Sequence, residues 1–191
     1  MLEHAPAKRG RWSYEPKLNG WRSLIHCPSR SMWNRHGKPL SIAKCFQPVL
    51  DALAASGITW LDAEALERRV PVGKGSLIIL DLPDHPGTYD ERQQAIYDQL
   101  ISPGHAESWG HEQFAPPPAS LLHFAYTYSD SDSDEDLRPG AAWQRLQEIN
   151  RTLGCELFEG LVAKRADSHY PIQLHSPDTT TPLWVKHRWH F

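Results

Sequence analysis

The sequence has little cysteine, no excess of positive charge and no long apolar run. Its 3 cysteines lie far apart in a chain of 191 residues, with no Cys-x-x-Cys pair and no spacing suited to a zinc site. An odd number of cysteines without an apolar N-terminal leader indicates free thiols in a reducing compartment, so we expect a cytoplasmic protein. The longest apolar run, around residues 77–82, is far too short to cross a membrane.

The charge balance is slightly acidic. The chain has 20 Lys and Arg against 23 Asp and Glu, a formal net charge of -3. Proteins whose only task is to bind nucleic acid are usually basic. Any nucleic-acid partner must therefore be held by a local patch or by another subunit. A content of 40% hydrophobic residues, with 8 Trp, 6 Tyr and 5 Phe, excludes a disordered chain.

Strand-like runs alternate with turns and helices along the chain. Strands are predicted at residues 21–25, 31–34, 59–66, 77–82, 121–128, 160–164 and 183–187. Helices are predicted at residues 48–55, 90–100 and 141–153, with Asp90 as the N-cap of the second. No regular βαβ repeat is visible, which favours a single α+β domain over residues 1–191 with antiparallel sheets.

Three patterns look like phosphate or metal sites, but each lacks a feature that such a site needs. Residues 73–76 (GKGS) resemble a phosphate-binding loop, but they precede a strand and so predict a hairpin turn. The acidic run 129–136 (SDSDSDED) lacks the glycine and the final glutamate of a calcium loop, and we interpret it as a solvated loop. His187 and His190 are three apart in a strand-like tail, where that spacing points them to opposite faces.

Four other segments place charged residues inside strand-like runs. They are residues 17–22 (KLNGWR), 61–66 (LDAEAL), 158–164 (FEGLVAK) and 183–188 (LWVKHR). Each is ordinary alone: Asn-Gly is typical of a hairpin turn, and a carboxylate in a strand can lie on its solvent face. Together they supply three lysines and two glutamates, a set suited to binding a triphosphate. These residues are Lys17, Glu64, Glu159, Lys164 and Lys186.

The residue types predict a reaction at phosphorus. A lysine amine such as Lys17 attacks only when neutral, and nearby cations favour the neutral form. The same cations would neutralise the phosphates in the transition state. These cations are Arg22, Lys164 and Lys186. The carboxylate of Glu159 could hold Mg²⁺ directly or through water, and that of Glu64 could accept a hydrogen bond from a ribose hydroxyl.

Six motifs occur in order between Tyr14 and Arg188. They are KLNGWR, WNRHG, LDAEAL, LIILDL, FEGLVAKR and WVKHR. This ordered set resembles the nucleotidyltransferase motifs of ATP-dependent DNA ligases, and most of all those of bacterial end-joining ligases. The resemblance implies an α+β nucleotidyltransferase (ATP-grasp-like) fold, with two antiparallel sheets, flanking helices and a nucleotide cleft between the sheets.

The resemblance assigns a role to each matching residue of the first motifs. Lys17 matches the lysine that is adenylylated through a phosphoramidate. Glu15 matches a residue that helps to recognise adenine, and Arg22 an arginine near the ribose and phosphate. Arg35 matches an arginine of the phosphate-binding region, and Glu64 the glutamate that binds the ribose.

The later motifs supply the metal and phosphate ligands that the resemblance implies. Glu159 matches the glutamate associated with the metal. Lys164 and Lys186 match lysines at the nucleotide phosphates. Arg92 matches an arginine that often follows the central motif, and we expect it to be structural.

The chain departs from the family pattern at several positions. Asn19 stands where DNA ligases usually have Asp, and Arg188 replaces the second lysine of the final motif. Both changes keep the hydrogen-bonding character, so these residues remain candidate nucleotide ligands. Leu80 stands where an aromatic residue usually stacks on adenine, which predicts weaker base affinity. Residues 173–181 lack the usual Gly-Lys-Arg-Ser pattern.

The implied activity uses ATP with Mg²⁺ or Mn²⁺. Lys17 would take AMP and pass it to the 5′-phosphate of nicked DNA or RNA. The family's OB-fold domain is not expected within these residues, so a partner protein would supply its function and nucleic-acid binding by this chain would be weak. Two alternatives remain: an RNA ligase, which the change at Asn19 favours, and a weakly catalytic module that binds a nucleotide or a partner.

Overall fold

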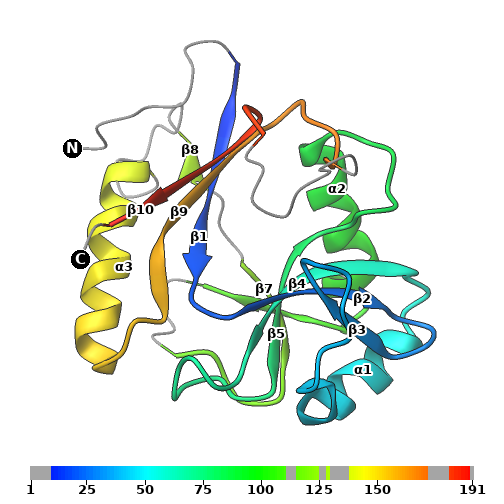
Figure 1. Ribbon diagram of the computed structural model, residues 1–191. Coiled ribbons are helices and arrows are strands. Elements are labelled where there is room, and N and C mark those ends of the chain that lie inside the picture. The colour runs from blue at the N-terminus through cyan, green and yellow to red at the C-terminus, as the bar shows by residue number, and fades with distance from the viewer. Residues whose placement is uncertain (1–9, 111–114, 125–127, 130–137, 172–180, 190–191) are drawn as a thin grey trace.

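The described part of the chain forms two β-sheets and three α-helices, shown in Figure 1. This computed structural model describes residues 10–110, 115–124, 128–129, 138–171 and 181–189. The acidic run predicted as a loop lies almost entirely outside these residues, as does His190.

The smaller sheet has four antiparallel strands in the order β10-β9-β1-β8. The strands are β1 (Trp12–Leu18), β8 (Tyr128–Ser129), β9 (Phe158–Arg165) and β10 (Trp184–Arg188). Helix α3 (Pro139–Leu153) covers this sheet and ends at Gly154, whose φ of 63° is the left-handed conformation typical of a helix end. Gly160 in β9 also has a positive φ, and a Cβ there would collide with the carbonyl oxygen of His187 in β10. Strand β10 therefore lies against β9 only because this residue has no side chain.

The larger sheet has six strands in the order β3-β2-β4-β5-β7-β6. They are β2 (Trp21–His26), β3 (Ser31–Asn34), β4 (Trp60–Leu66), β5 (Ser76–Asp81), β6 (Glu107–Trp109) and β7 (Leu121–Phe124). Short helices follow its strands: η1 (Ala43–Phe46), α1 (Gln47–Ala54), α2 (Tyr89–Ile96) and the π-helical turn η2 (Tyr97–Ile101).

Strand β5, at the centre of the larger sheet, is buried on both faces. Leu77 and Ile79 of β5 belong to the core that contains buried residues of α1 and α2, whereas Ile78 between them packs with α3 and the smaller sheet. A strand with two buried faces reads as a continuous apolar run, which explains residues 77–82. The molecule is therefore layered, with the larger sheet in the middle.

The predicted α+β architecture with two sheets is confirmed, with differences of detail. The larger sheet is mixed, because β7 pairs parallel with both β5 and β6. The single strand predicted at residues 121–128 is wrong: β7 and β8 belong to different sheets. Asp90 is also not the N-cap of α2. Thr88 is the cap, and the Glu91 carboxylate accepts from the Thr88 N–H at 2.7 Å, so the two residues form a capping box.

The Asn19–Gly20 turn connects the two sheets and does not form a hairpin. Strand β1 ends in the smaller sheet and β2 begins in the larger one. The N–H of Gly20 donates to Oε1 of Glu64 at 3.0 Å, and a Cβ at Gly20 would lie 2.7 Å from the carbonyl oxygen of Ala65. The predicted turn at residues 73–76 does close a hairpin, because β4 and β5 pair antiparallel on either side of it. None of the helices formed by the described residues is long and apolar enough to span a membrane.

Candidate active site

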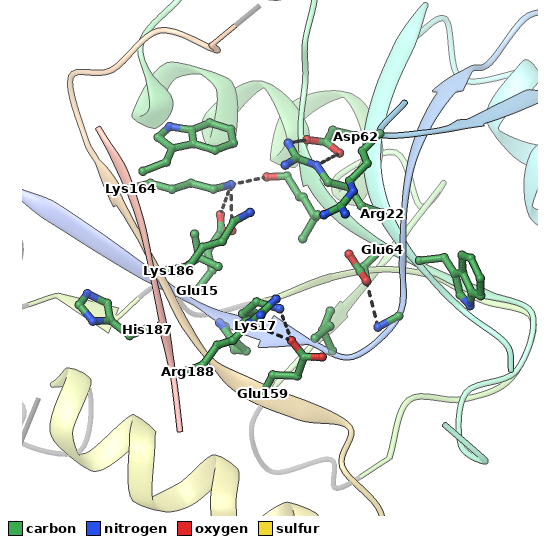
Figure 2. A pocket seen from close by; sticks show the side chains of 18 of the residues that line it. Glu15, Lys17, Arg22, Asp62, Glu64, Glu159, Lys164, Lys186, His187 and Arg188 are labelled. Atoms are coloured by element: carbon green, nitrogen blue, oxygen red, sulfur yellow. Dashed lines mark hydrogen bonds and ion pairs between the residues drawn. The ribbon is translucent and has the colours of Figure 1, made fainter. Parts of the chain in front are cut away.

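A cavity of about 1510 Å³ opens between the two sheets. Every predicted site residue except Asn19 lines it. The amide of Asn19 instead donates to the carbonyl oxygen of Glu156 at 3.0 Å, so this residue braces the turn. Figure 2 shows that the lining side chains of the two sheets face one another. Glu15, Lys17, Glu159, Lys164, Lys186 and Arg188 come from the smaller sheet, and Arg22, Asp62 and Glu64 from the larger one.

Lys17 and Glu159 form an ion pair in the wall of the cavity. The pairing of β1 and β9 is irregular here, because Lys17 lies opposite Gly160 while Leu18 lies opposite Phe158. A bulge of this kind redirects side chains, and it leaves Glu159 without a partner residue in the ladder. Arg188 on β10 adds a second cation, with its Nε 3.5 Å from the Glu159 carboxylate. An amine, a carboxylate and a guanidinium therefore meet at one point.

Lys164 and Glu15 form a buried ion pair deeper in the cavity. The ammonium of Lys164 is 2.8 Å from Glu15 and 3.6 Å from Asp81, and it lies 4.5 Å from the centre of the Trp184 ring. Tyr89 donates its hydroxyl hydrogen to Glu15 at 2.6 Å. Burial raises the pKa of the Glu15 carboxyl, and the Lys164 ammonium opposes that rise. The charge of Lys164 is thus already balanced by carboxylates.

Arg22 makes a two-point ion pair with Asp62 across neighbouring strands. Its Nε and Nη2 donate to the two carboxylate oxygens at 3.0 and 2.6 Å. Tyr170 donates to the same carboxylate at 2.9 Å, and burial raises the pKa of this phenol. The nearby Asp62 charge raises the pKa of Arg22, which stays a cation. This pairing fixes the guanidinium in the wall of the cavity.

Glu64 lies beside the turn that joins the sheets. Burial raises the pKa of its carboxyl to about 7, while the charges of Lys17 and Arg22 oppose the rise. Lys186 lies in the same cavity wall: burial lowers the pKa of its ammonium, and the charge of Arg22 adds to that effect. Burial disfavours any charge, but the nearby cations also lower this pKa, and it is their charge that favours an anion here. These cations are Arg22, Lys17, Arg188 and Arg35.

Leu80 and Arg92, both singled out in the sequence, make structural contacts. Leu80 lines the cavity, and its carbonyl oxygen accepts from Lys164 at 3.1 Å. Arg92 has no exposed surface and donates to both oxygens of Asp81 at 2.6 and 3.1 Å. It also donates to the carbonyl oxygen of Ser168 at 2.9 Å. The expectation that Arg92 is structural agrees with this burial and with these contacts.

Several residues of the site were not predicted from the sequence. Asp62, Trp184, Trp21 and Arg69 line the cavity, and Tyr170 lies behind Asp62, to which it donates a hydrogen bond. Strand alternation offered a signal for two of them. Asp62 is two residues before Glu64, and Trp184 two before Lys186, so each shares a strand face with a predicted residue.

The residues that line the cavity suit a metal ion whose ligands come mainly from the phosphates of a nucleotide. No group of three His, Cys, Asp or Glu side chains forms a metal cage among the residues placed by the structure. Mg²⁺ is commonly bound by one or two carboxylates together with phosphate oxygens and waters. Glu159 is the carboxylate nearest Lys17 and is suited to that part.

Solved structures of DNA ligases resemble this chain. No family model and no curated protein sequence matches it. The Chlorella virus DNA ligase-adenylate matches with a TM-score of 0.51 and 16% identity, over 88% of this chain and 60% of the viral one. The ligase domain of M. tuberculosis LigD matches with a TM-score of 0.53 and 21% identity, over 93% and 53%. The mycobacterial DNA ligase D complexed with ATP and MES gives 0.51 and 19%, over 93% and 54%.

This chain has the fold of ATP-dependent DNA ligase adenylation domains. It spans between 53% and 60% of the three ligase chains, so the likeness concerns one part of them. In this ligase-type fold the cavity lies between the two sheets, and Lys17 is in its wall.

Proposed function

We propose that this chain is an ATP-dependent, ligase-like adenylyltransferase that forms a covalent lysyl-AMP on Lys17. The observation that carries the proposal is the position of Lys17. Its amine lies in the wall of a large cavity, in contact with Glu159 and facing cations of both sheets. A lysine in such surroundings is suited to attack a phosphate rather than to stabilise the fold.

The first step transfers AMP from ATP to the lysine. A bond forms between Nζ of Lys17 and the α-phosphorus while the bond from that phosphorus to the bridging oxygen breaks. Pyrophosphate leaves with the electron pair, and the proton of the amine passes to water, which reaches the open cavity. The cations Arg22, Lys186 and Arg188 offset the charge that builds on the phosphates.

The other lining residues would hold the rest of the nucleotide. Glu64 is placed to accept a hydrogen bond from a ribose hydroxyl. Arg35 lines the same cavity and would bind the outer phosphates. Leu80 and Val162 supply apolar surface for the base. Glu159 is the residue that would hold Mg²⁺ or Mn²⁺, and the ion would neutralise phosphate charge when bound.

The second step delivers AMP to a polynucleotide. The adenylyl group would pass to the 5′-phosphate at a nick in DNA or RNA, and a 3′-hydroxyl would then displace it. The structural neighbours are DNA ligases by name, which supports a polynucleotide as the acceptor. A 5′-phosphate is small enough to enter a cavity of about 1510 Å³.

Incubation with ATP labelled at the α-phosphate, followed by denaturing electrophoresis, tests the proposal. We expect the wild-type chain to carry the label and Lys17→Ala to lose it, with a drop of more than about 100-fold, because the new bond is made to Nζ. Lys44→Ala is the matched control, since Lys44 is exposed and does not line the cavity.

The stability of the variant separates a lost nucleophile from a lost fold. In Lys17→Ala, Glu159 keeps Arg188 as a partner, so we expect the melting temperature to change by only a few degrees. Labelling of Lys17→Ala would disprove the assignment of the nucleophile. Binding of ATP by the wild type without any label would favour a nucleotide-binding module instead.

A further inference from the structure

Trp21 is an exposed aromatic residue at the edge of the cavity. Its side chain is 37% exposed, and Trp21 and Tyr97 are the exposed large hydrophobic residues in the part of the chain that the structure describes. Trp21 lines the cavity and Tyr97 does not. An isolated exposed aromatic residue needs no explanation, but one at the mouth of a candidate active site can contact what enters it.

The backbone holds Trp21 in this position. It is the first residue of β2 and lies opposite Ala65 of β4. Ser23 and Ile25 share its strand face and are fully buried, so the ring of Trp21 extends past the edge of the core. The preceding residue, Gly20, is fixed by its hydrogen bond to Glu64. The indole is therefore presented by a rigid strand.

Arg69 lies over the indole of Trp21. Its guanidinium carbon is 4.9 Å from the centre of the ring, within the range of a cation–π contact. Arg69 belongs to the connection between β4 and β5, whose ends are joined by a 3.0 Å hydrogen bond from the Gly75 N–H to the Leu66 carbonyl oxygen. Both Trp21 and Arg69 line the cavity, so an aromatic surface and a cation lie together there.

Arg69 differs from most cations of the cavity in its partners. Lys17 and Arg188 are paired with Glu159, and Arg22 is paired with Asp62. No carboxylate lies within 4.0 Å of Arg69 among the residues that the structure describes, and its guanidinium lies over the Trp21 ring. Its charge therefore remains available for an anion from outside the chain.

We propose that Trp21 and Arg69 form a docking platform for the polynucleotide strand that receives AMP. The base next to the acceptor 5′-phosphate stacks on the indole, and Arg69 binds a phosphate of the same strand. This inference rests on the proposed adenylyl transfer from Lys17. Aromatic rings stack on bases of any sequence because every base has a flat π-face. Arginine binds the backbone phosphates, which are the same for every sequence.

The position of the platform relative to Lys17 supports this occupant. Trp21 follows Lys17 by four residues, and both line one cavity. An acceptor phosphate that reaches Lys17 carries its own base, which must lie close to the cavity. A platform made of one aromatic ring and one arginine offers no pattern of hydrogen bonds to base edges, so we expect little dependence on sequence.

Binding of nicked duplexes measures the platform directly. A fluorescein-labelled nicked DNA duplex, and a matched duplex with RNA on the 5′-phosphate side, are titrated with the chain at about 50 mM salt and followed by anisotropy. We expect Trp21→Ala to bind at least one of them about ten-fold more weakly, whereas Trp21→Phe stays within about three-fold. Arg69→Ala should also weaken binding and reduce the salt slope by about one. Tyr97→Ala, the other exposed aromatic residue, should bind like the wild type.

Crosslinking and labelling distinguish the possible failures. A 5-iodouracil placed beside the nick should crosslink to the peptide that contains Trp21. Crosslinks to Trp143 or Trp189 instead, or unchanged affinity of Trp21→Ala for both duplexes, would overturn the platform. AMP labelling of Lys17 is measured in parallel, and we expect Trp21→Ala to lose less label than affinity. Absence of label in the wild type would contradict the adenylyl transfer, while the difference in binding would still test the platform.

Discussion

Glu159 has more than one cation to hold. Its carboxylate is held by Lys17 and Arg188, yet the proposed reaction also requires it to hold a metal ion. These uses do not conflict, because the phosphates of a bound ATP could pair with Lys17 and Arg188 and leave the Glu159 carboxylate to hold the ion. A carboxylate that exchanges partners in this way should affect the reaction more than the binding of ATP.

Substitution of Glu159 by glutamine tests that role. We expect Glu159→Gln to reduce the rate of AMP labelling at limiting Mg²⁺ at least ten-fold, a loss of about 1.4 kcal/mol of transition-state stabilisation, with partial recovery at high Mg²⁺. The affinity for ATP, measured by calorimetry, should change less. Glu148→Gln on the exposed face of α3 is the control. An unchanged rate at limiting Mg²⁺ would show that Glu159 has no part in holding the metal.

The raised pKa of Glu64 predicts a pH dependence of stability. Its carboxyl has a pKa of about 7 in the folded chain, against an ordinary value of 4.5. The folded state therefore binds this proton more tightly than the unfolded state does. The resulting contribution to stability is complete below about pH 4.5 and is lost as the pH rises through about 7. Because Glu64 lines an open cavity that water reaches, we expect an effect of about 1 kcal/mol.

Glu64→Gln should remove this pH dependence. Glutamine keeps an oxygen that can accept from the Gly20 N–H but has no proton to lose in this range. Urea unfolding at pH 5.5 and 7.5 measures the free energy of unfolding of both chains. The wild type should lose about 1 kcal/mol more than Glu64→Gln between these values. Glu107→Gln, at an exposed position of β6, is the matched control, and an equal loss in wild type and Glu64→Gln would contradict the assignment.

At the scale of elements, β10 depends on a single glycine. It carries Lys186 and Arg188 into the cavity, and it can pack on β9 only where Gly160 leaves room for the carbonyl oxygen of His187. The N-cap of α2 depends on local sequence in a similar way, because Thr88 and Glu91 satisfy each other's backbone groups. Each element is thus positioned by a contact of one or two residues.

Gly160→Ala should displace β10. We expect the free energy of unfolding to fall by about 1–3 kcal/mol, since the added methyl group meets backbone and not a flexible side chain. AMP labelling should also fall, because two cations of the cavity move with the strand. Gly140→Ala is the matched control: Gly140 is helical and nothing lies within 4 Å of an added Cβ, so a small gain of about 0.5–1 kcal/mol is expected. Equal stabilities of the two variants would contradict the role of Gly160.

At the scale of the whole molecule, charge limits binding to nucleic acid. The chain has 20 Lys and Arg against 23 Asp and Glu, and several cations of the cavity are already paired with carboxylates. Tight duplex binding takes about six to ten phosphate contacts, each with a nearby cation. The cavity supplies fewer than that once a nucleotide is bound.

The 191-residue chain should therefore bind and seal nicks poorly. We expect its affinity for a nicked duplex to be far weaker than nanomolar at physiological salt and to fall steeply as salt is raised. Anisotropy across a salt series measures the affinity, and gel electrophoresis of a nicked substrate measures sealing. Nanomolar binding at physiological salt together with efficient ATP-driven sealing would show that a basic face of this domain suffices. Repeating the assay with a pre-adenylylated nick separates slow labelling from slow sealing.

Local patterns in the sequence determined most elements and the chemical composition of the cavity. The helix at residues 48–55, the strand at 31–34 and the glycine end of α3 follow from periodicity and from short-range capping, which act between neighbours in the chain. The motifs also named nearly every charged residue that lines the cavity. Residue types and their spacing suffice for these inferences because strand alternation places every second side chain on one face.

Only the tertiary structure decided which residues meet. Asn19 and Gly20 have the sequence of a hairpin turn, yet the strands beside them pair with β9 and β4 instead. The pair formed by Lys164 and Glu15 joins residues 149 positions apart, and the partner of Arg22 is Asp62. Contacts of this range depend on how two sheets pack around shared cores, and that packing is a property of many side chains together rather than of any local pattern.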